Sequence, residues 1–185
     1  MSIDFKQAGY GDTSCLGDCT ETWINVSEHF DVNNISFSQY KNHTTGKVSV
    51  WITPHGTLLR CSETYPGTIS DTDITNQSGI LEMLERGTTV LTDKGFGITD
   101  LCLAKGLHNN RPPLKFDSQY EETDISKHFD IATLRIYNEN YIGRMRDWAI
   151  MNVCWPSNRI DILCYIHKVL AHIVNILKKP IGPKN

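Results

Sequence analysis

The sequence lacks the features that would place it in a membrane or in the secretory pathway. It contains no run of about 18 apolar residues, so no membrane-spanning helix and no membrane partner are expected. Residues 1–6 also lack the apolar core of a signal peptide. The six cysteines form no CxxC pair and no zinc-knuckle spacing, which predicts reduced thiols in an intracellular protein. Cys15 and Cys19 remain weak candidates for metal ligation.

Basic residues are also few for a protein that would bind nucleic acid alone. The chain has 18 Lys and Arg residues against 21 Asp and Glu residues, and its formal net charge is −3 at pH 7. Self-sufficient nucleic-acid-binding domains are usually basic overall. DNA binding would therefore need a local basic face, or a separate DNA-binding segment or partner protein. The 185 residues, of which 39% are hydrophobic, are enough for one domain over residues 1–185.

Alternating apolar and polar residues predict strands mainly in the first half, and longer periodic stretches predict helices mainly in the second half. Expected strands cover residues 15–26, 37–43, 47–53, 57–62 and 88–92, with a short extended piece before Arg111. Expected helices cover residues 70–84, 98–105, 123–151 and 158–179. This order predicts an α/β protein whose mixed sheet is flanked by helices, which is the element order of the ribonuclease-H-like fold.

The last expected helix, residues 158–179, carries a strong apolar stripe. We expect it to pack within the domain and to close one face of the sheet, although a dimer interface is an alternative use of the same stripe. The residues expected to form the stripe are Ile162, Cys164, Ile166, Val169, Leu170, Ile173, Val174 and Leu177.

Three carboxylates lie in elements that this fold brings together. Asp18 lies in the first strand, Asp93 directly follows the apolar strand that ends at Thr92, and Glu139 lies in helix 123–151. In the ribonuclease-H-like fold, acids at these three places meet. The residues alone leave other interpretations open. Asp93 could cap the next helix, and Glu139 could be a surface acid paired with Arg135 at i−4.

Converging carboxylates are the hard oxygen ligands that Mg²⁺ or Mn²⁺ requires. Two such ions roughly 4 Å apart can bind a phosphoryl group in line from both sides and assist its displacement. Asp18, Asp93 and Glu139 are therefore the candidate metal ligands and catalytic residues. Without metal, repulsion among clustered acids should raise at least one of their pKa values.

Several polar residues near these acids have two interpretations each. Basic side chains could contact DNA phosphate, or could instead neutralise a neighbouring acid or lie on a solvated face. Asp71 could be a fourth acid at the site or the N-cap of the helix that follows it, and Glu21 is expected to be structural or exposed. The candidate DNA-binding residues are Lys41, His43, Lys94, Arg135, Arg144 and Arg146.

An ordered set of motifs resembles the DDE superfamily endonuclease domain of eukaryotic PIF/Harbinger-like transposases. The matching segments are GDCTET (17–22), SFSQYKNHTTGKVSVWITPHG (36–56), YPGTISDTDIT (65–75), LTDKGF (91–96), RPPLKF (111–116) and IATLRIYNENYIGRMRDW (131–148). The resemblance implies a ribonuclease-H-like fold, a Mg²⁺ or Mn²⁺ cofactor, a nuclear location, and DNA strand cleavage and transfer at transposon ends. It also implies that Asp18, Asp93 and Glu139 are the metal ligands.

The chain departs from the family pattern in two places. The third-acid motif reads RIYNEN where the family usually has RIHVER, so Tyr137, Asn138 and Asn140 are substitutions around a retained Glu139. The catalytic match also begins almost at Met1, so recognition of DNA ends is expected to need a further segment or a partner protein. These departures motivate a rival hypothesis, a domesticated or decayed domain that serves as a non-catalytic binding module. A phosphatase, or a nuclease of another substrate class, is a third. The oligomeric state stays open.

Overall fold

The computed structural model describes residues 3–93, 95–111 and 122–177. Its mixed sheet has the strand order β2-β3-β1-β6-β7, and β4 and β5 also pair with β3. The strands are β1 Thr13–Trp23, β2 Phe37–Ser38, β3 His43–Ile52, β4 Leu58–Cys61, β5 Tyr65–Pro66, β6 Thr89–Thr92 and β7 His108–Asn110. The helices are α1 Ile3–Gln7, α2 Phe30–Ser36, α3 Asp71–Ser78, α4 Thr99–Ala104, α5 Glu122–Arg146 and α6 Ile160–Leu177.

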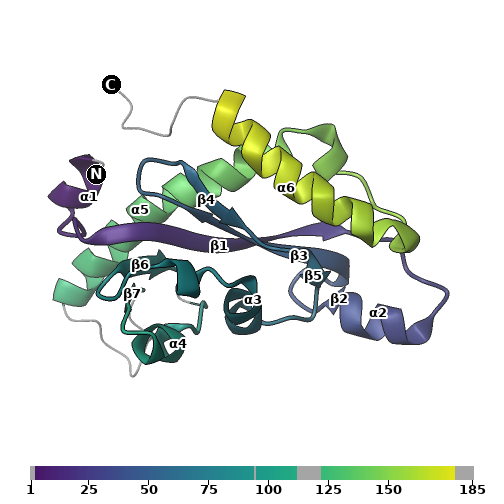
Figure 1. Cartoon of the computed structure of the whole chain (residues 1–185), viewed down its shortest axis with the longest axis horizontal. Coiled ribbons are helices and arrows are strands. Elements are labelled where there is room, and N and C mark those ends of the chain that lie inside the picture. The colour runs from purple at the N-terminus through teal and green to yellow at the C-terminus, as the bar shows by residue number, and fades with distance from the viewer. Residues whose placement is uncertain (1–2, 94, 112–121, 178–185) are drawn as a thin grey trace.

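The sheet combines an antiparallel meander with a parallel extension. β3 runs antiparallel to β1, β2, β4 and β5, whereas β6 runs parallel to β1 and β7 runs parallel to β6. Helices cover both faces of this sheet (Figure 1). The expected mixed sheet flanked by helices is therefore confirmed.

Two apolar clusters fill the space between the sheet and its helices. Alternation along each strand sends successive side chains to opposite faces. Leu16 and Leu91 join the cluster that includes residues of α5 and α6, whereas their neighbours Cys15 and Val90 join the cluster beside α4. The segments of β1 and β6 that pair with each other are thus buried on both faces, and β6 is buried at every position.

Several expected elements differ from the observed ones. The helix expected over residues 70–84 ends at Ser78, because Gly79 adopts a left-handed conformation with φ 69° and a short 3-10 turn, Leu81–Met83, follows. Helix α5 ends at Arg146, and a 3-10 turn, Ala149–Met151, takes the place of its expected last turn. Helices α1 and α2 were not expected at all, since both are short and weakly periodic. The RPPLKF motif falls largely outside the described residues.

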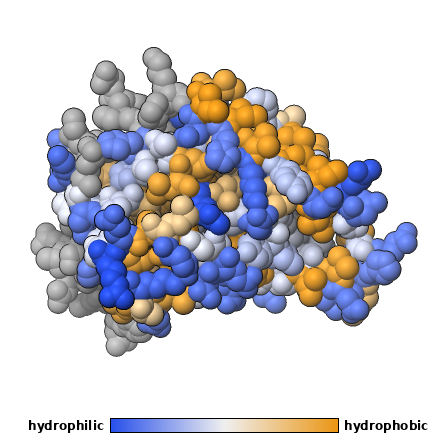
Figure 2. Space-filling model, in the orientation of Figure 1, coloured by the Kyte–Doolittle hydropathy of each residue, from blue (hydrophilic) through white to orange (hydrophobic). Residues whose placement is uncertain are grey.

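The buried face of α6 is shifted from the expected stripe. Its buried residues are Leu163, His167, Leu170, Ala171 and Val174, whereas the expected stripe residues Val169 and Leu177 are exposed. The apolar periodicity did not predict this face because its central residue, His167, is polar. Figure 2 shows apolar surface along this helix. The segment Ser157–Leu177, with a mean hydropathy of 1.6, is also long and apolar enough to cross a membrane by length and composition alone.

Two hydroxyl groups accommodate His167 in the core. Its Nε2 lies 2.9 Å from Thr22 Oγ1 and its Nδ1 lies 2.7 Å from Thr64 Oγ1. Burial disfavours the charged imidazolium and lowers the pKa of His167 to about 4. The ring is therefore neutral in the folded protein at neutral pH and ties β1 and the chain before β5 to α6.

Acid should destabilise the protein through His167. Below pH 6.5 the histidine of the unfolded chain takes up a proton, whereas the folded protein resists protonation until about pH 4. The contribution of His167 to the unfolding free energy should therefore fall as the pH drops through this window, by up to about 3 kcal/mol. Urea unfolding of wild type and His167→Gln across this range measures the effect. Equal pH slopes in the two proteins would contradict it.

Gly17 allows β1 to pass close to a buried ring. A Cβ atom at this position would lie 2.5 Å from the Trp51 ring, and Trp51 is fully buried with its ring packed edge-on to Phe96. The position directly before Asp18 therefore requires glycine.

We predict that Gly17→Ala destabilises the fold by about 1–3 kcal/mol, since the added methyl group overpacks the core. Gly143→Ala in α5 is the matched control, because its Cβ would meet no atom within 4 Å and alanine favours helix. Chemical unfolding of both variants measures the difference. A Gly17→Ala protein as stable as Gly143→Ala would show that Trp51 can move aside.

Candidate active site

Two of the three candidate acids lie side by side where β6 ends. β1 and β6 are parallel, and their register runs through Leu16↔Leu91 to a last pair at Gly17↔Thr92. The next residues are Asp18, which lies within β1 and pairs with Val50 of β3, and Asp93, which directly follows β6. Neighbouring strands lie about 4.8 Å apart, so the two acids are neighbours at the carboxyl end of β6. The N-cap residue of α4 is Ile98, so Asp93 does not occupy the cap position that the sequence left open to it.

One guanidinium group connects Asp93 to Glu139. Arg135 Nη1 lies 3.0 Å from Asp93 Oδ1, and Nη2 of the same side chain lies 3.4 Å from Glu139 Oε1. Arg135 and Glu139 are one turn apart on α5, so the helix presents both to the end of β6. The ion pair between Glu139 and Arg135, which the sequence left open as an alternative, is present. The same arginine also binds Asp93, so the pair is part of the site.

Asp18 is the most buried of the three acids. Burial raises the pKa of its carboxyl to about 6; the backbone N–H of Cys19, which donates to Asp18 Oδ1 at 2.7 Å, and the charge of Arg135 oppose this rise. The negative charges of Asp93 and Asp71 add to it. This accords with the expectation that clustered acids raise a pKa, although burial is the larger cause. The charges of Asp93 and Arg135 thus lie close enough to Asp18 to affect its pKa.

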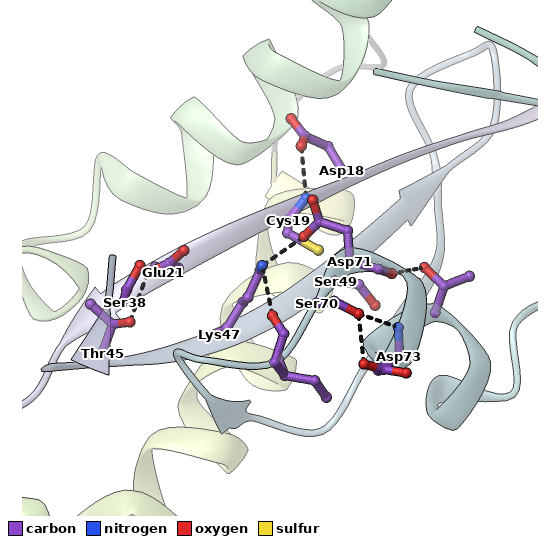
Figure 3. A network of polar contacts seen from close by, with 12 residues as sticks. Asp18, Cys19, Glu21, Ser38, Thr45, Lys47, Ser49, Ser70, Asp71 and Asp73 are labelled. Carbon is purple, nitrogen blue, oxygen red and sulfur yellow. Dashed lines mark hydrogen bonds and ion pairs between the residues drawn. The ribbon is translucent and has the colours of Figure 1, made fainter. Parts of the chain in front are cut away.

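A further carboxylate, that of Asp71, forms an ion pair with Lys47 beside β1 (Figure 3). Lys47 Nζ lies 2.6 Å from Asp71 Oδ1 and donates to the Ile69 carbonyl oxygen at 3.1 Å. Burial would lower the pKa of Lys47, but the hydrogen bond and charge of Asp71 raise it overall. Asp71 also interacts with the Cys19 thiol, whose pKa burial and this carboxylate raise.

Ser70, not Asp71, caps helix α3. The Ser70 hydroxyl accepts a hydrogen bond from the backbone N–H of Asp73 at 3.0 Å, and Asp71 is the first residue of the helix. The interpretation of Asp71 as the N-cap is therefore wrong. Because Ser70 is the N-cap residue, the Asp71 side chain is free of that role and lines the cleft described below. The signal that was available is Lys47, a lysine that directly precedes the largely apolar strand residues 48–52 and needs a partner for its charge.

A cleft of about 460 Å³ contains these groups, and we call it the acid cleft. Its lining includes four acids and three basic residues: Asp18, Glu21, Asp71, Asp93, Lys41, Lys47 and Arg146. Arg135 borders it through its contact with Asp93, Glu139 is connected to it through Arg135, and neither residue lines it. Side chains of both charges therefore line one solvent-accessible space beside the middle of β1 and the carboxyl end of β6.

The candidate DNA-binding residues do not all lie at this cleft. Arg146 is held there, since its Nε and Nη2 donate to Thr20 Oγ1 at 3.1 and 2.7 Å. Lys41 is exposed, with its Nζ 4.6 Å from the centre of the Tyr40 ring. Arg144 does not line the acid cleft. Its positive charge lies near Tyr141, where burial raises the pKa of the phenol and Arg144 opposes that rise.

The remaining candidates have other surroundings. The His43 ring stacks on Trp23, with ring centroids 5.0 Å apart. Lys94 lies outside the described residues. Glu21 accepts a hydrogen bond from Thr45 Oγ1 at 2.7 Å, which accords with the structural role expected for it.

Residues 17–175 match a protein family described as the DDE superfamily endonuclease. The chain belongs to that family. The match includes Asp18, Asp93 and Glu139 and nearly all of the described sheet. No curated protein and no solved structure matches the chain. As a DDE superfamily member it carries a transposase-derived endonuclease domain, and its mixed sheet is consistent with the ribonuclease-H-like fold of that family.

DDE endonucleases typically use divalent metal ions, and the donor set of this cleft suits them. All the acids that meet here are carboxylates, the hard oxygen ligands that Mg²⁺ and Mn²⁺ prefer. Within the described part of the chain, no three His, Cys, Asp or Glu side chains are close enough together to hold an ion as they stand. Arg135 instead places its positive charge between Asp93 and Glu139. A metal ion bound to both acids would therefore need this side chain to move.

Proposed function

We propose that the chain is the catalytic domain of a PIF/Harbinger-like transposase that cleaves and transfers DNA strands. Asp18, Asp93 and Glu139 would be its catalytic carboxylates and its metal ligands. The observation that carries the proposal is the position of Asp18 and Asp93 side by side, directly after the last pair of β1 and β6, with Glu139 joined to Asp93 through Arg135. Family membership supports a nuclease.

Mg²⁺ or Mn²⁺ held by the three acids would polarise the scissile phosphate and activate the attacking hydroxyl. The protein's own residues prepare this arrangement. The N–H of Cys19 fixes the orientation of the Asp18 carboxylate, and Arg135 holds Asp93 and Glu139 near each other while no cation is bound. Once released, the Arg135 guanidinium would lie next to the reacting phosphate, where its fork of N–H groups suits phosphate oxygens.

DNA would bind along the basic residues that surround the acid cleft. Lys41 and Arg146 line the cleft, and we propose Lys94, His43, Arg135 and Arg144 as further contacts. The net charge of −3 is unfavourable for DNA binding by this chain alone. We therefore assign the recognition of transposon ends to a separate DNA-binding segment or partner protein. A transposase of this type would act in the nucleus.

The rival function, a non-catalytic binding module, rests on the altered third-acid motif. Tyr137 is buried and packs against Phe5 with ring centroids 5.4 Å apart. Asn138 is also buried, with its Nδ2 3.4 Å from the Val50 carbonyl oxygen. Both substitutions thus face the core, and Asn140 is the exposed one. Changes in core packing leave the acids in place, which favours retained catalysis.

A cleavage assay separates the two functions. Nicked or branched DNA is incubated with Mn²⁺ and wild type, Glu139→Gln or Glu85→Gln, an exposed glutamate away from the cleft that serves as the matched control. The proposal predicts cleavage by wild type and Glu85→Gln and its loss in Glu139→Gln. Equal background with all three proteins would establish the binding module.

A further inference from the structure

A second hollow adjoins the acid cleft, and we call it the aromatic hollow. It has a volume of about 240 Å³ and is lined by Trp23, Met151, Asn152 and Val153 together with three residues that also line the acid cleft. The shared residues are Glu21, Lys41 and Arg146. A chain that passes through the acid cleft would therefore continue directly into this hollow.

Trp23 gives the aromatic hollow a flat and rigid wall. It is the last residue of β1, and 54% of it is exposed, which is unusual for an indole in a sheet. Its ring stacks on the His43 ring with 14° between the planes. His43 Nδ1 lies 2.8 Å from the Thr44 carbonyl oxygen, which fixes the imidazole behind the indole. The stack therefore presents an aromatic face that is already oriented.

Positive charge lies where the two spaces meet. Arg146 is anchored by Thr20 Oγ1 and by the Glu21 carbonyl oxygen, to which its Nη2 donates at 3.3 Å. Lys41 lies on the same boundary and is exposed. The Glu21 carboxylate offsets part of this charge and is itself engaged by Thr45. Two basic side chains beside an exposed aromatic stack are the combination that binds single-stranded nucleic acid.

We propose that the aromatic hollow binds an unpaired nucleobase next to the scissile phosphate. The base would stack on Trp23, and Lys41 and Arg146 would contact the phosphates on either side of it. A base next to the scissile phosphate that is unpaired or extruded from the duplex would be held by this platform, which would keep the DNA end in register with the acids. The inference rests on the proposed function, because it places the reacting phosphate in the acid cleft.

Binding without metal tests the subsite apart from cleavage. The probe is duplex DNA with a short unpaired flank that carries 2-aminopurine, in EDTA and at low salt. Wild type should quench the 2-aminopurine fluorescence by stacking, and Trp23→Leu should abolish the quenching and weaken binding of the flanked DNA about tenfold. Trp23→Phe should restore part of both. Fully paired DNA should bind equally to wild type and to Trp23→Leu.

Trp148→Leu is the matched control, since this tryptophan is 39% exposed and lines neither hollow. It should bind the probe as wild type does. Equal quenching by Trp23→Leu and Trp148→Leu would overturn the subsite. So would a change in oligomeric state by light scattering in Trp23→Leu with unchanged DNA binding, which would assign the hollow to a protein partner. Quenching without Mn²⁺-dependent cleavage in wild type would keep the subsite and reject the nuclease.

Discussion

Asp93→Asn is expected to remove Mn²⁺ binding and to reduce DNA cleavage on the order of a thousandfold or more. The substitution keeps the shape of the side chain but removes one of the negative charges that a divalent cation needs. Bound metal contributes several kcal/mol of transition-state stabilisation in phosphoryl transfer, and each 1.36 kcal/mol corresponds to about tenfold in rate. The variant also loses the ion pair with Arg135, which lies 3.0 Å from the carboxylate.

Calorimetric titration with Mn²⁺ and a cleavage assay measure the two effects of Asp93→Asn. Asp100→Asn is the control, because Asp100 is an exposed aspartate in the first turn of α4 and lines no part of the acid cleft. It should bind Mn²⁺ and cleave DNA as wild type does. Mn²⁺ binding that persists unchanged in Asp93→Asn would remove this residue from the metal site and with it the proposed triad.

Asp18→Asn should make the metal-free protein more stable at pH 7, by up to about 3 kcal/mol. Burial raises the pKa of Asp18 from 3.8 to about 6, so the folded protein carries an unfavourable charge at neutral pH. Asparagine removes that charge and still offers an oxygen to the N–H of Cys19, which binds Asp18 Oδ1 in wild type. A residue retained at a cost in stability is typical of a functional site.

Urea unfolding in EDTA and in Mn²⁺ measures this prediction. Wild type should gain stability from Mn²⁺ through ligand binding to the folded state, and Asp18→Asn should gain little. Asp100→Asn again serves as the control and should respond to Mn²⁺ as wild type does. An Asp18→Asn protein that is less stable than wild type in EDTA would show that the carboxylate stabilises the fold.

The two shifted groups act in opposite directions on acid stability. Between about pH 4 and 6 the Asp18 contribution falls as the pH rises, because the folded state holds that proton more tightly than the unfolded chain. The His167 contribution rises with pH over nearly the same window, because the folded state excludes its proton. Wild type should therefore show a small net slope from these two groups. Asp18→Asn should expose the slope of His167, and His167→Gln should expose that of Asp18.

The main elements of the fold could be read from the sequence because burial leaves a periodic record. Strands β1, β3 and β6 fall largely within the stretches whose apolar and polar pattern predicted strands, and helix α5 overlaps most of the stretch expected to be helical. Boundaries were less accurate, because they depend on local conformations such as the left-handed Gly79 that ends α3. The short helices α1 and α2 left no periodic signal of their own.

The acids of the site could also be selected from sequence, since Asp93 follows an apolar strand and its neighbours keep the motif pattern. Their relation in space could not. It depends on the last register pair of β1 and β6, Gly17↔Thr92, and on the reach of Arg135 from α5. Pairing register is set by contacts between residues far apart in the chain, which no local pattern records.

The sequence by itself determined the α/β class, the family to which the chain belongs, and the candidate acids Asp18, Asp93 and Glu139, because these depend on residue type and order. The tertiary structure decided which other side chains share their space. It placed Asp71 in the acid cleft with Lys47 rather than at a helix cap, and put the indole of Trp23 on an exposed stack. Side-chain direction follows from strand pleat, helix phase and cap choice together, and these are settled only when the elements pack.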